Sequence, residues 1–225
     1  MSKTIDFVDT TARWSIYAQI VLGLFSFVGF AGISNEEDVL VALLVSDLIV
    51  QAIEFVFYLV FVRLDAKVTA YRYIDWYIST PIMLLSTAIL LEFFATENTT
   101  NVVSLPSFFS TYANEAIYIV GMNTIMLTCG LTAELLGDTD NKGLSYTLLT
   151  LGNLAFVATF ILIFVEFGAK TIEGIVLLSV MCFIWSLYGL AAHFSYVPKN
   201  VMYNVLDIFS KNFYGTFIAI YLLAK

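Results

Sequence analysis

The sequence predicts an all-α membrane protein built as a bundle of seven transmembrane helices. Of its 225 residues, 60% are hydrophobic and only 12% are charged, whereas a soluble domain has about 25% charged and about 45–50% apolar residues. Seven stretches are apolar over roughly the 20 residues that a helix needs to cross a bilayer. The chain is too poor in charge to cover a water-facing surface, so we expect an integral, multi-pass membrane protein.

The seven apolar stretches are separated by short polar segments such as "RLDAK" and "GDTDNKG". Each stretch is continuously apolar and lacks the alternation of polar and apolar residues that a membrane β-barrel shows, which favours helices. The sequence indicates one domain over residues 1–225. The predicted spans are residues 14–32, 39–62, 70–94, 114–136, 144–167, 172–194 and 201–224.

Several classes of function are disfavoured by composition. The net charge of −8 argues against nucleic-acid binding. A single histidine, His193, cannot form a metal site alone, so no metal is expected. Cys129 and Cys182 fall inside predicted spans, where buried thiols are usually packing residues.

Asp207 and Lys211 lie near the centre of the seventh predicted span, four residues apart and therefore on one helical face. Charged side chains inside a membrane are costly and usually face the interior of the bundle. One interpretation is a salt bridge that makes a buried charge tolerable. The other is an amine buried so that it can form a Schiff base with a carbonyl compound. This span alone favours neither.

The third span, "YRYIDWYISTPIMLLS", adds a polar stripe made of Arg72, Asp75, Ser79 and Ser86. A buried cationic Schiff base needs an anion. Asp75 and Asp207 supply two, and Arg72 balances the surplus charge. This set of charges favours the reactive amine, because an isolated buried charge is strongly disfavoured.

The second span, "VSDLIVQAIEFVFYLVF", places Asp47, Gln51 and Glu54 on one helical face at spacings of four and three residues. One interpretation is that the carboxyl groups are neutralised by protonation and bonded to neighbouring helices. The other is a hydrated path for cations between the helices.

"RYIDWYISTP" and "LDIFSK" resemble the third- and seventh-helix signatures of the microbial (type 1) rhodopsins. "WSLYG" in span six and "VGMNTIMLTCGL" in span four are similar to the family's chromophore-lining stretches. The resemblance implies a seven-helix bundle with all-trans retinal in its core, bound covalently as a Schiff base. It also implies a photoreceptor rather than an enzyme. The expected partners are retinal, the lipid bilayer and cations or protons, and a homo-oligomer stays open.

By position, the resemblance implies roles for individual residues. Lys211 is the retinal attachment site, Asp75 the primary counterion and proton acceptor, and Asp207 the second counterion. Arg72 gates the extracellular side. The residues expected around retinal are Trp76, Thr80, Met83, Met126, Gly130, Trp185 and Tyr188.

Departures from the proton-pump pattern point to a channel. Pumping relatives carry a carboxylate where this chain has Ser86, which cannot return a proton near neutral pH. Channelrhodopsins carry a glutamate at the position of Glu54 and an asparagine directly after the retinal lysine, here Asn212. We therefore predict a light-gated cation channel, similar to the viral rhodopsins of marine protist viruses. The predicted ion path and gate comprise Asp47, Gln51, Glu54, Ser79, Ser86 and Asn212.

Some alternatives remain open from the sequence. Ser15 or Ser26 in span one could complete the gate. The protein could instead be a weak light-driven outward proton pump, or a photosensory rhodopsin that signals to a partner. The family places the N-terminus outside the cell, whereas the positive-inside rule disagrees. Seven basic residues fall on the N-terminal side, against Lys170 and Lys225 on the other. The seven are Lys3, Arg13, Arg63, Lys67, Arg72, Lys142 and Lys199.

Overall fold

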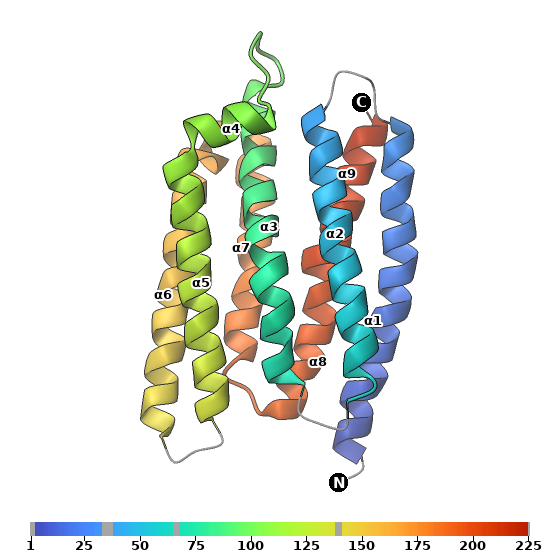
Figure 1. Cartoon of the computed structure of the whole chain (residues 1–225), viewed down its shortest axis with the longest axis vertical. Coiled ribbons are helices and arrows are strands. Elements are labelled where there is room, and N and C mark those ends of the chain that lie inside the picture. The colour runs from blue at the N-terminus through green and yellow to red at the C-terminus, as the bar shows by residue number, and fades with distance from the viewer. Residues whose placement is uncertain (1–2, 33–37, 65–67, 138–140, 225) are drawn as a thin grey trace. The chain divides into compact units, whose positions relative to one another are not determined.

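The computed structural model describes residues 3–32, 38–64, 68–137 and 141–224, and every regular element in these ranges is helical (Figure 1). The chain divides into two compact units. The first comprises Met1–Asp75 and Ile184–Lys225, and the second comprises Trp76–Phe183. Helix α3 (Thr69–Thr96) and helix α7 (Ile172–Ala191) each contribute residues to both units. That residues 1–225 form one retinal-binding domain stays a prediction.

The predicted membrane spans are helical in the structure. In the described residues, six helical stretches are long and apolar enough to cross a membrane: Phe7–Ala31, Val39–Phe61, Thr69–Thr96, Ala113–Leu136, Lys142–Lys170 and Ile172–Ala191. The seventh predicted span is made of three consecutive helical elements. These are α8 (Tyr196–Asp207), a π-helical turn η3 (Ile208–Asn212) and α9 (Phe213–Ala224).

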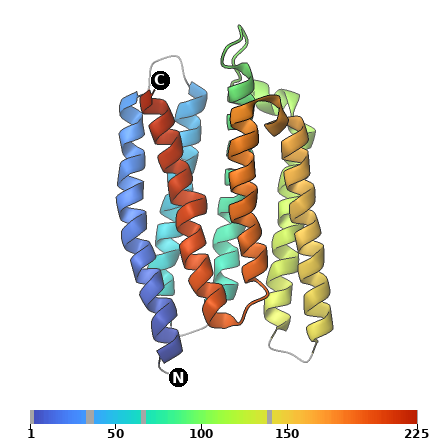
Figure 2. The ribbon, with the colours of Figure 1, turned by 180° about the vertical axis from the view of Figure 1, so that it is seen from behind.

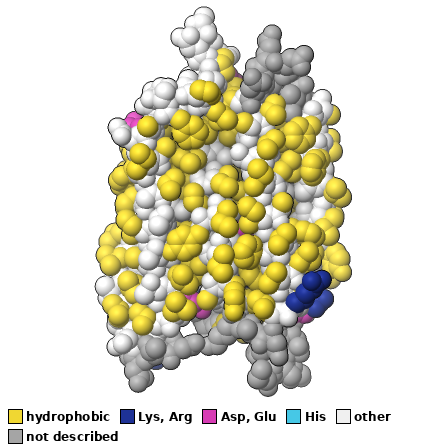
Figure 3. Space-filling view, viewed as in Figure 1, with side chains coloured by type: hydrophobic (Ala, Val, Ile, Leu, Met, Phe, Trp, Pro, Cys, Tyr) yellow, Lys and Arg dark blue, Asp and Glu magenta, His cyan; other side chains and the backbone are white. Residues whose placement is uncertain are grey.

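Large apolar side chains lie on the outside of these helices, as contact with lipid requires. Trp14, Leu24 and Ile117 are each more than 60% exposed, and Figure 3 shows hydrophobic side chains spread over the visible face. The direction in which the chain crosses the membrane stays a prediction. Lys67 and Lys225, two of the basic residues counted for it, lie outside the described residues.

In the first unit, α1 (Lys3–Val28) and α2 (Asp38–Phe61) pack against each other and against the seventh helical stretch. Figures 1 and 2 show α1, α2 and α9 side by side from opposite directions. Gly215 of α9 lies directly against the side chains of Asp47 and Gln51, and a Cβ atom at this position would overlap with both. The absence of a side chain therefore makes room for a polar pair between α2 and α9.

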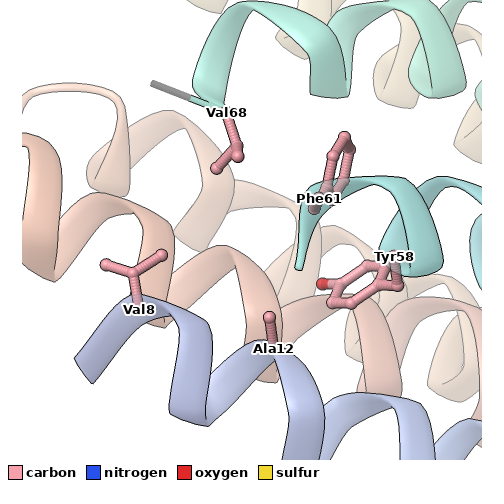
Figure 4. Close-up of a cluster of buried hydrophobic side chains, with 5 residues drawn as sticks. All are labelled: Val8, Ala12, Tyr58, Phe61 and Val68. Atoms are coloured by element: carbon pink, nitrogen blue, oxygen red, sulfur yellow. The ribbon is translucent and has the colours of Figure 1, made fainter. Parts of the chain in front are cut away.

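The first helix begins at Lys3, whereas the sequence predicted a span starting at residue 14. Two features extend the helix through its polar beginning. Val8 and Ala12, one turn apart, pack with Tyr58, Phe61 and Val68 in a buried cluster (Figure 4). Nearby, Arg13 Nε donates to Asp9 Oδ2 at 2.8 Å across one turn, a spacing that supports helix.

In the second unit, α5 (Ala113–Leu136) and α6 (Lys142–Glu166) pack side by side along their length (Figures 1 and 2). Gly152 of α6 makes a close approach possible, since a Cβ atom there would lie 3.3 Å from the backbone oxygen of Met126. The backbone of α5 at Met126 is thus in direct contact with α6.

A short helix that the sequence analysis did not predict, α4 (Leu105–Thr111), precedes α5. Ser104 and Ser107 form a reciprocal capping box at its start, and Pro106 occupies its first turn. Both features favour helix initiation. The signal was present in "SLPS", but the segment is too short to show a hydrophobic period.

Hydrogen bonds among Lys170, Glu92 and Tyr112, which we call the polar staple, link three elements of the second unit. Lys170 Nζ, at the end of η2 (Gly168–Lys170), donates to Glu92 Oε2 of α3 at 2.5 Å and to Tyr112 OH at 3.1 Å. Tyr112 OH in turn donates to Glu92 Oε1 at 3.0 Å. The three side chains therefore close a ring of hydrogen bonds.

Replacing Lys170 with methionine is expected to lower the stability of the protein by about 1 kcal/mol or less, because the ion pair is partly exposed. Thermal unfolding followed by circular dichroism measures the change. Lys142→Met, at an exposed position that begins α6, is the matched control and should have no comparable effect. Equal unfolding midpoints for both variants would show that the staple does not contribute.

Candidate functional site

Lys211 lies in the π-helical turn η3 with its side chain only 2% exposed. Its Nζ donates a hydrogen bond to Asp75 Oδ2 of α3 at 2.7 Å and lies 3.9 Å from Asp207 Oδ1. All three residues belong to the first unit. The structure therefore brings together the amine and the two carboxylates that the sequence singled out.

The carboxylate of Asp207 is fixed by two tyrosines. Tyr58 OH of α2 donates to Oδ2 at 2.7 Å, and Tyr188 OH of α7 donates to Oδ1 at 2.8 Å. Tyr188 OH also lies 2.7 Å from Ser210 Oγ. Sequence reasoning identified Tyr188 as a chromophore neighbour, but it missed Tyr58 and the role of both hydroxyl groups.

Arg72 is buried in a cradle of neutral and charged acceptors. Its Nε donates to Asn200 Oδ1 at 3.1 Å, and its Nη2 donates to Asn204 Oδ1. Its Nη1 donates to Tyr58 OH at 3.2 Å and to Asp207 Oδ2 at 3.3 Å. Four hydrogen bonds thus hold one guanidinium group.

The two asparagines are themselves oriented by the bonds that their amide nitrogens make. Asn200 Nδ2 donates to Thr69 Oγ1 at 2.8 Å, and Asn204 Nδ2 donates to Thr11 Oγ1 at 2.8 Å. Each amide oxygen is therefore left to face Arg72. This arrangement could not be predicted from the sequence, because an asparagine near a helix terminus is common.

A second group of buried polar side chains begins next to Lys211 and runs along α2. Gln51 Oε1 accepts from Asn212 Nδ2 at 3.2 Å, and Gln51 Nε2 donates to Ser26 Oγ at 3.1 Å and to Asp47 Oδ2. Further along α2, Glu54 Oε1 accepts from Gln19 Nε2 of α1 at 3.0 Å. We name this group the polar seam: Gln19, Ser26, Asp47, Gln51, Glu54 and Asn212.

Both serines that the sequence left as alternatives contact this region. Ser26 bonds to Gln51 directly, whereas Ser15 Oγ accepts from Gln19 Nε2 at 3.1 Å. The residue that touches Glu54 is Gln19, which sequence reasoning missed. Its spacing from Ser15 and Ser26 places all three on one face of α1, and this pattern could have revealed it.

Other predicted site residues belong to the second unit. Thr80 Oγ1 donates to the backbone oxygen of Trp76 at 2.7 Å, and Asn123 Nδ2 donates to Thr80 Oγ1 at 2.9 Å. Trp76, Met83, Ser79 and Ser86 are buried, whereas Met126 and Gly130 are half-buried. Trp185 is buried in the first unit. That these residues surround a chromophore on Lys211 stays a prediction.

A comparison with known protein families shows the family to which the chain belongs. The model of the family described as "Bacteriorhodopsin-like protein" matches residues 7–225. The chain belongs to the bacteriorhodopsin-like family. No curated protein sequence matches this bacteriorhodopsin-like chain.

Solved structures agree with the family assignment. The viral rhodopsin OLPVRII is 22% identical and superposes with a TM-score of 0.77, covering 95% of this chain and 96% of its own. A thermophilic rhodopsin from Rubrobacter xylanophilus is 18% identical, with a TM-score of 0.73 and coverage of 96% and 97%. A light-driven proton pump from Leptosphaeria maculans is 14% identical, with a TM-score of 0.73 and coverage of 96% and 94%. The chain therefore has the seven-helix fold of microbial rhodopsins, as the sequence predicted.

The bacteriorhodopsin-like family implies a retinal chromophore, and the residues around Lys211 fit such a group. An aldehyde needs a primary amine for attachment, and the resulting cationic nitrogen needs buried anions. Lys211 offers the amine, while Asp75 and Asp207 are 1% exposed and within 4 Å of Nζ. The hydroxyl groups of Tyr58 and Tyr188 keep Asp207 in place beside it.

Proposed function

We propose that this bacteriorhodopsin-like protein is a light-gated cation channel whose retinal is bound to Lys211 as a Schiff base. The observation that supports a channel is the polar seam, in which α1, α2 and the seventh helix contribute buried oxygen and amide groups. Carboxylate and carbonyl oxygens can replace part of the hydration shell of a cation. Retinal, when bound, supplies the light-driven change of shape.

The first residue step that we propose is a proton transfer. The proton on Lys211 Nζ moves to Asp75 Oδ2, the oxygen atom 2.7 Å away. This transfer neutralises one cation and one anion in a region with few water-accessible atoms. Asp207 is the poorer proton acceptor, because both of its oxygens already accept hydrogen bonds from Tyr58 and Tyr188.

The second step couples Lys211 to the seam. Asn212 follows Lys211 directly in the chain, and its amide bonds to Gln51 at 3.2 Å. A displacement of the Lys211 backbone therefore stretches the hydrogen bond between Asn212 and Gln51 first. Once it breaks, Gln51 can release Ser26 and Asp47, and water can enter between α2 and α9.

An outward proton pump is the second candidate, since the Leptosphaeria protein is described as a light-driven proton pump. Two features disfavour it here. Ser86 provides no acid to return a proton, and Arg72 is surrounded by the neutral amides of Asn200 and Asn204. Neither amide can release a proton near neutral pH.

Voltage-clamped cells that express the protein distinguish the candidate functions. We expect a photocurrent that reverses its direction with membrane voltage and with the cation gradient. An outward current that does not reverse would indicate a pump. The absence of current from a coloured, correctly inserted protein would indicate a photosensor. Either of these two results contradicts the channel.

Replacing Glu54 with glutamine is expected to leave the pigment intact and to reduce the photocurrent severalfold or shift its cation selectivity. The change removes the carboxyl group that Gln19 contacts while keeping the size of the side chain. Current–voltage curves in sodium and potassium solutions measure the effect. Glu173→Gln, the same chemical change at an exposed position of α7, should behave as wild type. Unchanged currents in the Glu54 variant would remove it from the ion path.

A further inference from the structure

Four buried polar atoms on α1, α2 and the seventh helix have no hydrogen-bond partner in the described part of the chain. They are Gln19 Oε1, Glu54 Oε2, Asn212 Oδ1 and Thr216 Oγ1. Gln19 is 4% exposed, and Glu54 and Asn212 are completely buried. Buried polar groups are almost always paired, because an unpaired one costs about 1–3 kcal/mol. Several in one region therefore indicate an unseen partner.

The contacts between these helices link the residues that carry three of these oxygens, those of Gln19, Glu54 and Asn212. Gln19 bonds to Glu54, and Asn212 bonds to Gln51. Gln51 and Glu54 are three residues apart on α2, and neighbours at that spacing face the same way. Gly23, one turn after Gln19 on α1, also lies against Gln51 Oε1. The residues that carry the amide oxygen of α1, the carboxylate of α2 and the amide oxygen of η3 are thus linked through two neighbouring positions of α2.

The chemistry of the three carboxylate and amide oxygens selects the partner. All three are acceptors, so they need a donor or a cation. A proton on Glu54 supplies one donor and serves one neighbouring oxygen, and a water molecule has two hydrogens to offer. A metal cation can contact all three oxygens at once, and carboxylate and carbonyl oxygens are the ligands that hard cations prefer.

The charge of the site sets the valence of the cation. Lys211 pairs with Asp75, and Arg72 pairs with Asp207. Both buried basic residues of this region are therefore matched by other carboxylates, and neither forms an ion pair with Glu54. One ionised carboxylate and two neutral amides carry a single negative charge, which one monovalent cation balances.

We propose that Gln19 Oε1, Glu54 Oε2 and Asn212 Oδ1 form a dark-state binding site for a monovalent cation of the size of sodium. The proposal rests on the proposed function, because it makes this site the resting position of a transported ion. Gln19 has a double role: its amide nitrogen orients Glu54 through the 3.0 Å hydrogen bond, and its oxygen contacts the ion. A proton on Glu54 competes with the cation for the same carboxylate.

The test is equilibrium binding in the dark, which needs neither light nor current. The full-length protein in lipid nanodiscs is titrated with sodium chloride against N-methyl-D-glucamine chloride at constant ionic strength. Thermal unfolding is followed by circular dichroism. A ligand that binds the folded state raises the unfolding midpoint, whereas the bulky organic cation cannot enter the site. We expect a saturable rise with sodium that needs more sodium as the pH falls.

Variants assign the effect to the site. Glu54→Gln and Gln19→Leu should abolish the sodium-dependent rise, whereas the exposed Glu173→Gln should keep it. Gln19→Glu supplies a second carboxylate, so this variant should respond more strongly to sodium and should acquire a response to calcium. The gain of a calcium response is a result that a merely destabilising change would not produce.

The outcomes separate this proposal from the channel. Equal midpoints in sodium and N-methyl-D-glucamine, or a sodium effect that survives Glu54→Gln, overturn the cation site even if reversing photocurrents are present. A sodium effect that depends on Gln19 and Glu54 establishes the site even if no reversing photocurrent is found, and then only the channel fails.

Discussion

Lys211→Ala is expected to give a protein that stays colourless when retinal is added. Alanine removes the only amine that is buried within 4 Å of both Asp75 and Asp207 in the described residues. Without it the aldehyde has no nucleophile at this place. The measurement is the visible absorption spectrum of the purified protein after incubation with all-trans retinal.

Because Lys211→Ala leaves Asp75 without its cation, the variant could also lose its fold. Lys211→Arg keeps the charge, but a guanidinium group is always protonated and does not attack an aldehyde. Both variants should therefore be colourless, and circular dichroism should show that Lys211→Arg remains helical. Lys170→Ala, which removes a lysine in the second unit, should keep the pigment. A stable retinal pigment in Lys211→Ala would refute the assignment of the attachment site.

Arg72→Leu is expected to destabilise the protein by about 3–5 kcal/mol, the cost of leaving one partner of a buried ion pair without the other. The change removes the guanidinium partner of Asp207 and the donor that Asn200 and Asn204 face. Tyr58, Phe61 and Tyr203, whose rings lie 5.0–5.9 Å from the guanidinium carbon, would lose their contacts with it as well. The free energy of unfolding measured in a denaturing detergent gives the size of the effect.

Arg13→Leu is the matched control for this experiment. Arg13 also pairs with an aspartate, but its side chain is 58% exposed and its partner is four residues away on the same helix. Exposed pairs of this kind contribute little, so the variant should be close to wild type. Arg72→Lys should fall between the two, since an ammonium keeps the charge but cannot match the planar fork of donors. Equal free energies of unfolding for Arg72→Leu and Arg13→Leu would show that the buried contacts of Arg72 do not stabilise the protein.

Much of the fold could be predicted from the sequence, because a bilayer imposes a minimum length of apolar helix. The predicted spans 39–62 and 114–136 agree with α2 and α5 to within a few residues. The start of the first helix could not be found in this way. Polar residues such as Asp9 and Arg13 mark the end of an apolar run, but they also pair along a helix that continues through them.

The candidate site could be predicted in the parts that carry unusual charges. Charged residues such as Lys211, Asp75 and Asp207 attract attention in any apolar segment, and the structure places both carboxylates within 4 Å of the Lys211 amine. Gln19, Asn200 and Asn204 were missed. Each is a neutral residue whose significance depends on which way its helix faces, and that rotation is set by packing and not by local sequence.

The π-helical turn Ile208–Asn212 explains how one helix reaches α2 twice. In an unbroken α-helix, residues five positions apart point about 140° away from each other. Asp207 and Asn212 are five apart, yet Asp207 bonds to Tyr58 and Asn212 bonds to Gln51, both on α2. The wider turn, with its bonds between residues i and i+5, brings the two side chains back into line. Lys211 thus lies between two residues, Asp207 and Asn212, that are both hydrogen-bonded to α2. A movement of Lys211 is therefore transmitted to α2 at two points.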